Sequence, residues 1–211
     1  MILTVGNTKG GVGKTTVAIN LAILRNLAGR DVLLVDGDDQ GTAGLFSQLR
    51  ADQTGKCGYT AVNLHGAAVR TQVRQLGPKY DDIVIDVGGR DTGSLRAALT
   101  VSDVLLVPVQ PRTFDVWALD QVAALVKEAR EINPSLRAMA FLNAADAQGR
   151  DNAEAREAMA EVNGIETTEL VLVRRKAYPN AASQGRGILE MLTKDPKAIE
   201  ELTALAKMAF R

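Results

Sequence analysis

Short apolar runs alternate along the chain with longer stretches in which apolar residues recur at every third or fourth position. Consecutive apolar residues are typical of parallel strands covered on both faces, and the longer spacing is typical of amphipathic helices. The predicted strands are Ile2–Val5, Val32–Val35, Ile83–Val87, Val104–Val109, Ala138–Leu142 and Leu170–Val173. The predicted helices are Thr15–Leu27, Leu95–Thr100, Val116–Ile132, Asn152–Val162 and Ile199–Phe210. This alternation predicts an α/β fold with a doubly wound, mostly parallel sheet flanked by helices.

Local signals mark the ends of several predicted helices. Gly29 ends the first helix, and Asp115 is well placed to cap the helix that starts at Val116. Trp117 lies just inside that helix, where we expect it to pack against neighbouring side chains. No linker, repeat or low-complexity segment interrupts the pattern, so we expect a single domain over residues 1–211.

Composition narrows the class of protein. Of the 211 residues, 46% are apolar and 24% are charged, as in ordinary globular proteins. No apolar run reaches the ~20 residues that span a bilayer, and no secretory signal precedes the first strand, so we expect a cytoplasmic protein. Cys57 is the only cysteine, which excludes an internal disulfide. Because 25 basic residues balance 25 acidic residues, any contact with nucleic acid must come from a local basic patch.

A glycine-rich turn between the first strand and the first helix is typical of a phosphate-binding loop, or P-loop. The motif G-x-x-x-x-G-K-[ST] is matched at Gly13, Lys14 and Thr15. Residue 8 is threonine where the first glycine is expected, and a second lysine, Lys9, follows it. Lys14 is predicted to reach the β- and γ-phosphates, the Thr15 hydroxyl to ligate Mg²⁺, and Thr16 to bond the α-phosphate. Four further loop residues are expected to surround the phosphates: Gly10, Gly11, Val12 and Gly13.

Three acidic residues follow two of the predicted strands. Asp36 and Asp38 come at the carboxyl end of their strand, where ligands bind in open parallel sheets, and side chains two residues apart point to the same side. One of the pair could hold a magnesium-bound water and the other could orient the attacking water; we assign the first role to Asp36 and the second to Asp38. Asp86 ends another apolar strand and precedes two glycines, as does the acid that supports the Mg²⁺ shell in P-loop ATPases.

Together these motifs resemble those of the ParA-type ATPases of the deviant Walker A class, which are relatives of MinD. The family pattern of a lysine and two glycines before G-K-[ST]-[ST] matches the residues from Lys9 to Thr16. The family's D-x-D-P-Q motif matches the residues from Asp36 to Gln40, with Asp39 in place of proline. The stretch "SDVLLVPVQPRTFDVWAL" is similar to the family's proline-containing strand and loop. The resemblance covers most of the chain and implies a P-loop ATPase that binds ATP and Mg²⁺ and releases ADP and phosphate.

The resemblance also implies roles for residues whose chemistry alone is ambiguous. In this family the extra lysine, here Lys9, crosses the interface of an ATP-dependent homodimer and contacts the phosphates of the other subunit, so that it acts in catalysis with Lys14 and Asp38. Asn143, at the end of a predicted strand, matches an asparagine that binds the adenine. Relatives bind DNA non-specifically through late basic residues, which contact phosphates without reading bases. The candidates here are Arg174, Arg175, Lys176 and Arg186.

The resemblance therefore predicts a nucleoid-associated partition ATPase that positions plasmid or chromosome cargo. A ParB-like, centromere-binding partner is expected to stimulate hydrolysis. The chain begins directly at the first strand, so it resembles the short ParA form without an N-terminal helix-turn-helix. The cargo itself, whether plasmid, chromosome or carboxysome, has no recognisable motif in the sequence.

The alternative is a MinD-like or other cargo-positioning ATPase that acts on a membrane or a protein assembly. Membrane cycling needs an amphipathic C-terminal helix with bulky apolar and basic residues. The last predicted helix contains Glu200 and Glu201 among many alanines, which favours packing in the core and no membrane contact. An iron–sulfur relative is excluded, because one cysteine cannot supply the two per subunit that the nitrogenase iron protein uses.

Overall fold

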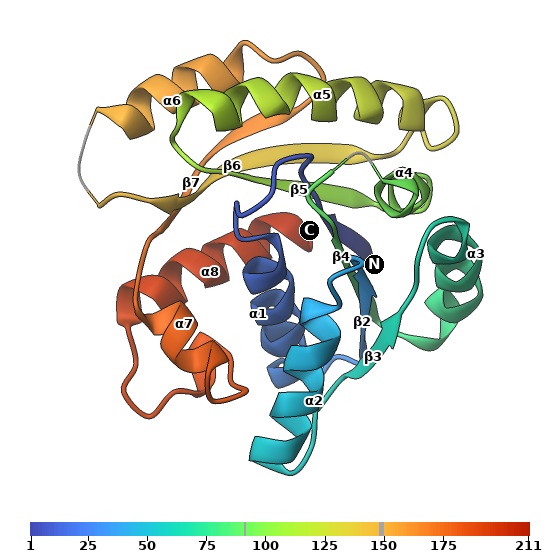
Figure 1. Cartoon of the computed structure of the whole chain (residues 1–211), viewed down its shortest axis with the longest axis vertical. Helices are drawn as coiled ribbons and strands as arrows, with labels where there is room; N and C mark the ends of the chain where they lie inside the picture. Colours follow the sequence, from blue (N-terminus) through green and yellow to red (C-terminus); the bar gives the residue numbers. More distant parts are fainter. Residues whose placement is uncertain (91, 148–149) are drawn as a thin grey trace.

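The computed structural model describes residues 1–90, 92–147 and 150–211, except for the side chains of residues 113–116. The described strands form one parallel sheet in the order β3-β2-β4-β1-β5-β6-β7 (Figure 1). They are β1 (Ile2–Val5), β2 (Val32–Gly37), β3 (Thr60–Asn63), β4 (Asp82–Val87), β5 (Val104–Val109), β6 (Arg137–Ala145) and β7 (Glu166–Val173). The chain crosses to the other side of β1 between β4 and β5. In open α/β sheets such a switch leaves a crevice at the carboxyl ends of the strands, where ligands bind.

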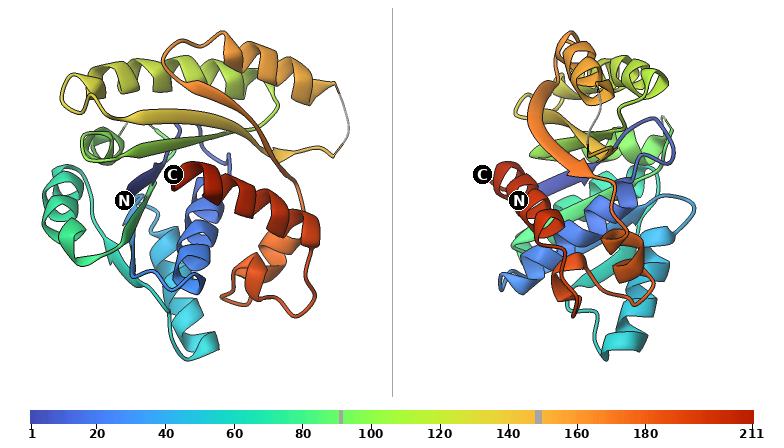
Figure 2. Two further views of the ribbon diagram at one scale, coloured as in Figure 1. Left: turned by 180° about the vertical axis from the view of Figure 1, so that it is seen from behind. Right: turned by 90° about the vertical axis from the view of Figure 1, so that its left-hand side faces the viewer.

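Helices cover both faces of the sheet (Figures 1 and 2). They are α1 (Lys14–Leu27), α2 (Thr42–Thr54), α3 (Ala67–Leu76), α4 (Gly93–Leu99), α5 (Thr113–Arg130), α6 (Asp151–Ala160), α7 (Ala177–Ala182) and α8 (Pro196–Ala209), with short 3₁₀ turns η1 (Gly77–Lys79) and η2 (Ile188–Glu190). Helices α3 to α6 share one buried apolar cluster with the sheet, and α1, α2, α7 and α8 share a second. Among the helices of the described residues, none is long and apolar enough to cross a membrane.

Consecutive side chains of a central strand belong to different apolar clusters, which explains the unbroken apolar runs in the sequence. In β2, Leu33 and Val35 lie in the cluster of α3 to α6, whereas Leu34 lies in the cluster of α1 and α8. Alternate side chains of a strand point to opposite faces, so a strand covered on both faces must be apolar at every position. The predicted doubly wound parallel sheet is therefore confirmed.

One strand and two helices in the first half of the chain were not predicted. Residues 60–63, which form β3 at the edge of the sheet, are largely exposed. Helix α3 buries only Val69 and Val73, and α2 buries a mixture of apolar and polar side chains that includes Arg50. β3 and α2 therefore lack a clear apolar periodicity. In α3, by contrast, Val69, Val73 and Leu76 recur at helical spacing, so this helix could have been predicted.

The predicted start of α5 is wrong, and so is the predicted packing of Trp117. The helix begins at Thr113 and Arg112 occupies the cap position, so Asp115 lies inside the first turn; the side chain of Asp115 is outside the described residues. Trp117 is 62% exposed. It lies on the opposite side of the helix from the buried Leu119, because an α-helix has 3.6 residues per turn.

The register of the sheet brings the predicted site segments to one level. Asp86 of β4 is paired in register with Val5 of β1 on one side and with Asp36 of β2 on the other. The P-loop follows β1, the acidic loop follows β2, and a glycine pair follows β4. These three loops therefore leave the sheet side by side at its carboxyl edge.

Candidate nucleotide-binding site

The loop between β1 and α1 is tightly enclosed, and two glycines make this possible. Gly13 has a φ of 89°, a left-handed conformation that favours glycine, and a Cβ there would collide with the side-chain nitrogen of Asn143. Gly89, in the loop after β4, passes so close that an added Cβ would lie 2.7 Å from the Cα of Gly10. The P-loop is therefore held between β6 and the loop after β4.

Lys14 opens α1, and its side chain folds back over the P-loop. It is 6% exposed, and its Nζ donates a hydrogen bond to the carbonyl oxygen of Lys9 at 2.8 Å. Burial lowers the pKa of Lys14, while the carboxylates of Asp86 and Asp38 oppose that shift. A phosphate in the loop would supply further negative charge to this buried ammonium group.

Asp86 is a buried carboxyl group, and neither oxygen has a hydrogen bond of ordinary geometry within the described residues. Burial raises the pKa of Asp86 to about 7; the Thr15 hydroxyl and Lys14 oppose the rise, and the carboxylates of Asp36 and Asp38 add to it. No three Asp, Glu, His or Cys side chains of the described residues converge on a metal position. Mg²⁺ usually keeps several water ligands in proteins, and such waters would donate the hydrogen bonds that Asp86 lacks. The residues present therefore fit a hydrated Mg²⁺.

The two acids after β2 have different partners. Asp36 is 2% exposed, and its carboxylate accepts hydrogen bonds from the N–H groups of Gly44 at 2.7 Å and Asp38 at 3.2 Å. Asp38 is half-buried, and its Oδ1 accepts a hydrogen bond from the N–H of Gln40 at 3.1 Å. An added Cβ at Gly88 would lie 3.2 Å from that oxygen, so Asp38 lies against the loop after β4. Asp36 thus fixes the start of α2, whereas Asp38 faces the neighbouring loop.

A cleft of about 570 Å³ lies over these groups at the carboxyl edge of the sheet. Its walls come from the P-loop, the acidic loop after β2 and the loop after β4. Lys14, Thr15 and Asp38 line it, whereas Asp36 and Asp86 are not among its described lining residues. The cleft therefore brings together most of the residues that the sequence singled out for phosphate chemistry.

Lys9 is exposed, although its backbone is held firmly. Its N–H donates a hydrogen bond to Asn7 Oδ1 at 2.9 Å, and its carbonyl oxygen accepts the bond from Lys14. Asn7 in turn donates to the carbonyl oxygen of Pro108, at 2.9 Å, in β5. Lys9 is not among the described residues that line the cleft. Its contact with a second subunit stays a prediction.

A smaller pocket of about 180 Å³ lies beside the P-loop. Asn143 is 8% exposed, and its Nδ2 donates a hydrogen bond to the carbonyl oxygen of Val12 at 2.6 Å. The remaining Oδ1 can only accept a hydrogen bond, which suits the amino group of adenine. The adenine contact of Asn143 stays a prediction. Helix α7, which the sequence did not predict, adds Tyr178 and Pro179 to the lining of this pocket.

The late basic residues have different surroundings. Arg175 donates a hydrogen bond to Glu201 at 2.5 Å and lies 3.6 Å from the carboxylate of Asp195, so its charge is offset within the chain. Arg186 donates to the carbonyl oxygen of Glu190 at 3.3 Å. The exposed members of the set are Arg174 and Lys176. Contact with DNA remains a prediction for all of these residues, and the exposed ones are better placed for it.

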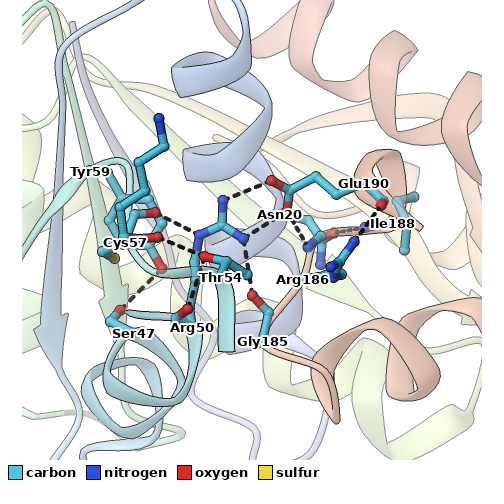
Figure 3. A network of polar contacts seen from close by, with 12 residues as sticks. Asn20, Ser47, Arg50, Thr54, Cys57, Tyr59, Gly185, Arg186, Ile188 and Glu190 are labelled. Carbon is cyan, nitrogen blue, oxygen red and sulfur yellow. Dashed lines mark hydrogen bonds and ion pairs between the residues drawn. The ribbon is translucent and has the colours of Figure 1, made fainter. Parts of the chain in front are cut away.

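A polar network ties α2 to the C-terminal part of the chain (Figure 3). Arg50 of α2 is 4% exposed, and its guanidinium donates two hydrogen bonds to the Glu190 carboxylate, at 2.7 and 2.8 Å. It also donates to the carbonyl oxygens of Cys57 and Gly185, at 2.6 and 3.0 Å. The helix that begins at the acidic loop is therefore fixed to the segment that follows α7.

Asn20 connects the same segment to the helix of the P-loop. Its Nδ2 donates a hydrogen bond to the carbonyl oxygen of Thr16 at 2.8 Å, and its Oδ1 accepts one from the N–H of Ile188 at 3.0 Å. Asn20 is buried and lies one helical turn after Thr16. The nucleotide-binding helix and the C-terminal segment therefore share one hydrogen-bonded residue.

Two polar residues that support the P-loop were not predicted from the sequence. Asn7 connects Lys9 to β5, and the Nε2 of Gln110 donates a hydrogen bond to the carbonyl oxygen of Gly11 at 3.0 Å. Both residues come shortly after a buried apolar strand. That is the signal that singled out the acidic residues, and it could have found these two.

These features define the class of protein. The chain has a P-loop nucleotide-binding fold. This fold combines a buried strand, a glycine-rich turn with Lys14 and Thr15, a following helix, and acids at the ends of two adjacent strands. The chain matches the family described as the CobQ/CobB/MinD/ParA nucleotide binding domain over residues 3–188. It belongs to that family, and the predicted relationship to ParA and MinD is confirmed.

Individual relatives agree with this assignment. The chain is 27% identical over 204 residues to the maintenance of carboxysome distribution protein A of Halothiobacillus neapolitanus, which covers 96% of this chain and 93% of the relative. It is 32% identical over 172 residues to the chromosome-partitioning ATPase Soj of Thermus thermophilus, covering 66% of this chain and 67% of the relative. Its fold matches that of a McdA variant from Cyanothece, solved in complex with ATP, with a TM-score of 0.82 and 20% identity over 99% of this chain and 95% of the other.

Proposed function

We propose that this protein is an ATPase that positions cargo by cycling between an ATP-bound dimer and a monomer. The observation that carries the proposal is the difference between the two P-loop lysines. Lys14 is buried and lines the cleft, whereas Lys9 is exposed and is not among the described residues that line it. A P-loop already surrounds its own phosphates on one side, so a cation from a second subunit would act from the other side. There it would stabilise the charge that develops on the transferred phosphoryl group.

Within one chain, the remaining residues would bind and orient the nucleotide. The P-loop N–H groups, Lys14 and Thr16 would hold the phosphates. Thr15 and Asp86 would hold hydrated Mg²⁺, which neutralises phosphate charge when it is bound. Asp38 lines the cleft and would orient the attacking water.

Two further residues would act indirectly or on the base. Asp36 uses its carboxylate to hold the backbone of the acidic loop and the first turn of α2, so it would support the Mg²⁺ shell by fixing this loop. Asn143, held by Val12, would accept a hydrogen bond from the amino group of adenine.

The cargo is proposed first as a general kind of object and then by the partner protein that it would need. The names of two relatives describe the distribution of carboxysomes and the partitioning of chromosomes, and both are the positioning of a large object. We propose that the dimer binds DNA non-specifically and that a cargo-bound partner protein stimulates hydrolysis. That partner would be ParB-like if the cargo is a plasmid or chromosome, and a different adaptor if the cargo is a protein assembly. A membrane-cycling role is not favoured, because Leu202 and Leu205 of α8 are buried against the sheet.

The experiment that tests this function compares Asp38→Ala with Asp52→Ala. Asp52 is exposed and is not among the described residues that line the cleft, so it is a matched control. Sedimentation velocity with ATP, with ADP and without nucleotide should show that Asp38→Ala binds ATP and accumulates as a dimer while its phosphate release is slow. Asp52→Ala should turn over ATP as the wild type does. A wild-type chain that stays monomeric with ATP, and an Asp38→Ala variant with normal turnover, would overturn the proposal.

A further inference from the structure

The cleft over the P-loop has a second positive side chain besides Lys14. Arg90, in the loop after β4, lines the cleft of about 570 Å³ and is exposed. Among the described side chains and backbone groups, none forms a hydrogen bond or ion pair with the Arg90 guanidinium. Lys14, by contrast, is buried and donates a hydrogen bond within the P-loop. The guanidinium of Arg90 is therefore available to an anion in the cleft.

The backbone around Arg90 is anchored on both sides. An added Cβ at Gly89 would lie 2.7 Å from the Cα of Gly10 and 3.1 Å from the Nζ of Lys14, so Gly89 packs directly on the P-loop. Consecutive Cα atoms are about 3.8 Å apart, and the Arg90 side chain thus begins one residue away from this contact. The Thr92 hydroxyl accepts a hydrogen bond, at 3.2 Å, from an N–H group in the first turn of α4. Arg90 therefore lies between the P-loop and the cap of α4.

The loop after β4 borders one particular end of the proposed nucleotide site. Gly13 and Thr16 line both the cleft and the smaller pocket of Asn143, so the base end of the nucleotide would lie beside them. Arg90 lines the cleft and is not among the described lining residues of that smaller pocket. Asp38, which would orient the attacking water, lies against the same loop. This loop is therefore at the γ-phosphate end of the site.

The charges in the cleft leave room for a further cation at that end. The described lining residues include two cations, Lys14 and Arg90, and two carboxylates, Asp38 and Asp39. The carboxylates of Asp38 and the buried Asp86 already attract the Lys14 ammonium group. A γ-phosphate beside these acids adds negative charge that ADP lacks. A planar guanidinium suits this position, because it donates paired hydrogen bonds to two phosphoryl oxygens.

We propose that Arg90 binds the γ-phosphate of the ATP held by its own chain, and that it thereby makes the site prefer ATP to ADP. Its role differs from that of Lys9, which would reach the phosphates from a second subunit. The inference deepens the proposed function by adding a residue that distinguishes the two nucleotides, and it rests on that function for the nucleotide itself.

The test compares Arg90→Gln with Arg74→Gln. Glutamine removes the charge and keeps part of the side chain, and Arg74 is an exposed arginine of α3 that is not among the described lining residues of the cleft. Isothermal titration calorimetry with Mg²⁺ measures the affinities for ADP and for a non-hydrolysable ATP analogue. Arg90→Gln should bind the analogue about tenfold more weakly and ADP within about twofold of the wild type. Arg74→Gln should bind both nucleotides as the wild type does.

The ratio of the two affinities is the decisive quantity, because unfolded chains bind neither nucleotide and leave the ratio unchanged. An equal loss of affinity for ADP and for the analogue in Arg90→Gln would overturn the proposal, and so would wild-type affinity for both. The competing ligand of an exposed arginine is a DNA phosphate. If Arg90→Gln loses DNA binding and keeps the wild-type ratio, the proposal fails.

A second background tests whether Arg90 acts on its own chain. Lys9→Ala chains are expected to lose the ATP-dependent dimer, which sedimentation velocity verifies. Adding Arg90→Gln to them should again lower the affinity for the analogue about tenfold and spare ADP. An effect of Arg90→Gln that disappears in the Lys9→Ala background would place the contact across the subunit interface and overturn the proposal. These titrations involve no hydrolysis, so their failure is distinct from that of the proposed ATPase function, which would appear as absent turnover in the wild type.

Discussion

The Nζ of Lys14 donates a hydrogen bond to the carbonyl oxygen of Lys9, so the side chain of one P-loop lysine holds the backbone of the other. Lys14 is buried and faces the cleft, whereas Lys9 is exposed. The buried lysine therefore orders the loop from which the exposed one extends. This relationship lets the roles of the two lysines be separated by experiment.

Replacing Lys14 with alanine should weaken ATP binding by about a hundredfold or more. The loop loses the cation that faces its own phosphates, and a charge-assisted hydrogen bond to phosphate is worth about 2 to 3 kcal/mol. Isothermal titration calorimetry measures the change, and the exposed Lys79→Ala serves as the control. Wild-type affinity in the Lys14 variant would contradict the P-loop assignment.

Replacing Lys9 with alanine should leave ATP binding within about threefold and reduce turnover about a thousandfold, as when a trans-acting cation is removed. The decisive measurement mixes Lys9→Ala chains with Asp38→Ala chains, each nearly inactive alone. In a mixed dimer, one site keeps its own Asp38 and receives Lys9 from the other subunit, so turnover should recover. No recovery on mixing would show that Lys9 acts within its own chain.

Asp86→Asn should stabilise the nucleotide-free protein above about pH 7 and abolish the Mg²⁺-dependent gain in ATP affinity. Burial raises the pKa of Asp86 from 3.8 to about 7, so the folded state keeps a proton that the unfolded state has lost. Stability therefore falls as pH rises between these values, by about 4 kcal/mol in total, and the amide avoids that loss.

Urea unfolding of this variant at about pH 5 and pH 8 tests the sign, because the wild type should lose stability relative to the variant as pH rises. The exposed Asp52→Asn is the control and should follow the wild type. Parallel curves for the wild type and the Asp86 variant would show that the carboxyl is not held protonated.

Glu190→Gln should destabilise the protein by about 2 kcal/mol at neutral pH, because the buried guanidinium of Arg50 loses its charged partner. The hydrogen bonds from Arg50 lower the pKa of Glu190 below 4.5 despite its partial burial. The contribution of Glu190 to stability is thus fully present above its pKa in the unfolded state. It is lost as pH falls through its lower pKa in the folded state. Urea unfolding should show the two proteins converging as the solution is acidified, whereas the exposed Glu200→Gln should match the wild type throughout.

Duplex DNA should bind in the presence of ATP, regardless of sequence, with a log–log salt slope of about −0.9 for each phosphate contacted. Arg174→Ala/Lys176→Ala should weaken binding to all duplexes alike, because both side chains are exposed. Arg175→Ala should mainly cost stability, since its guanidinium is held by Glu201. Fluorescence anisotropy at two salt concentrations measures this, with Lys56→Ala/Lys79→Ala as the control pair and ATP affinity measured separately. If the Arg175 variant alone loses DNA binding, the assignment by exposure is wrong.

The sequence predicts those parts of the fold that depend on residues close together in the chain. Central strands such as β2 and β5 are covered on both faces, so they appear as unbroken apolar runs. The P-loop is a contiguous motif whose glycines, lysine and threonine have fixed spacing. Lys14 and Thr15 belong to this motif, and Asp38 follows an adjacent buried strand at the carboxyl edge of the sheet. These three residues could therefore be predicted to line one cleft, which they do.

The parts that escape prediction depend on partners distant in the chain. Asn143 holds Val12, and Arg50 holds Glu190, yet nothing near either residue in the sequence indicates its partner. Strand β3 is short and largely exposed, so it buries too little apolar surface to leave a pattern. Trp117 was predicted to pack, although the helical period places it opposite the buried Leu119 wherever the helix begins.

The contacts of the segment around η2 also determine how it exchanges its amide hydrogens with solvent. The N–H groups of Gly187 and Ile188 donate to the side chains of Glu190 and Asn20, and Glu190 is itself held by Arg50. Exchange at Ile188 therefore requires the segment to separate from Asn20 of α1, and exchange at Gly187 requires release from Glu190, which Arg50 of α2 holds. A connector with only one short 3₁₀ turn should consequently show the slow exchange of a core helix, and it should open together with α2 as one cooperative unit.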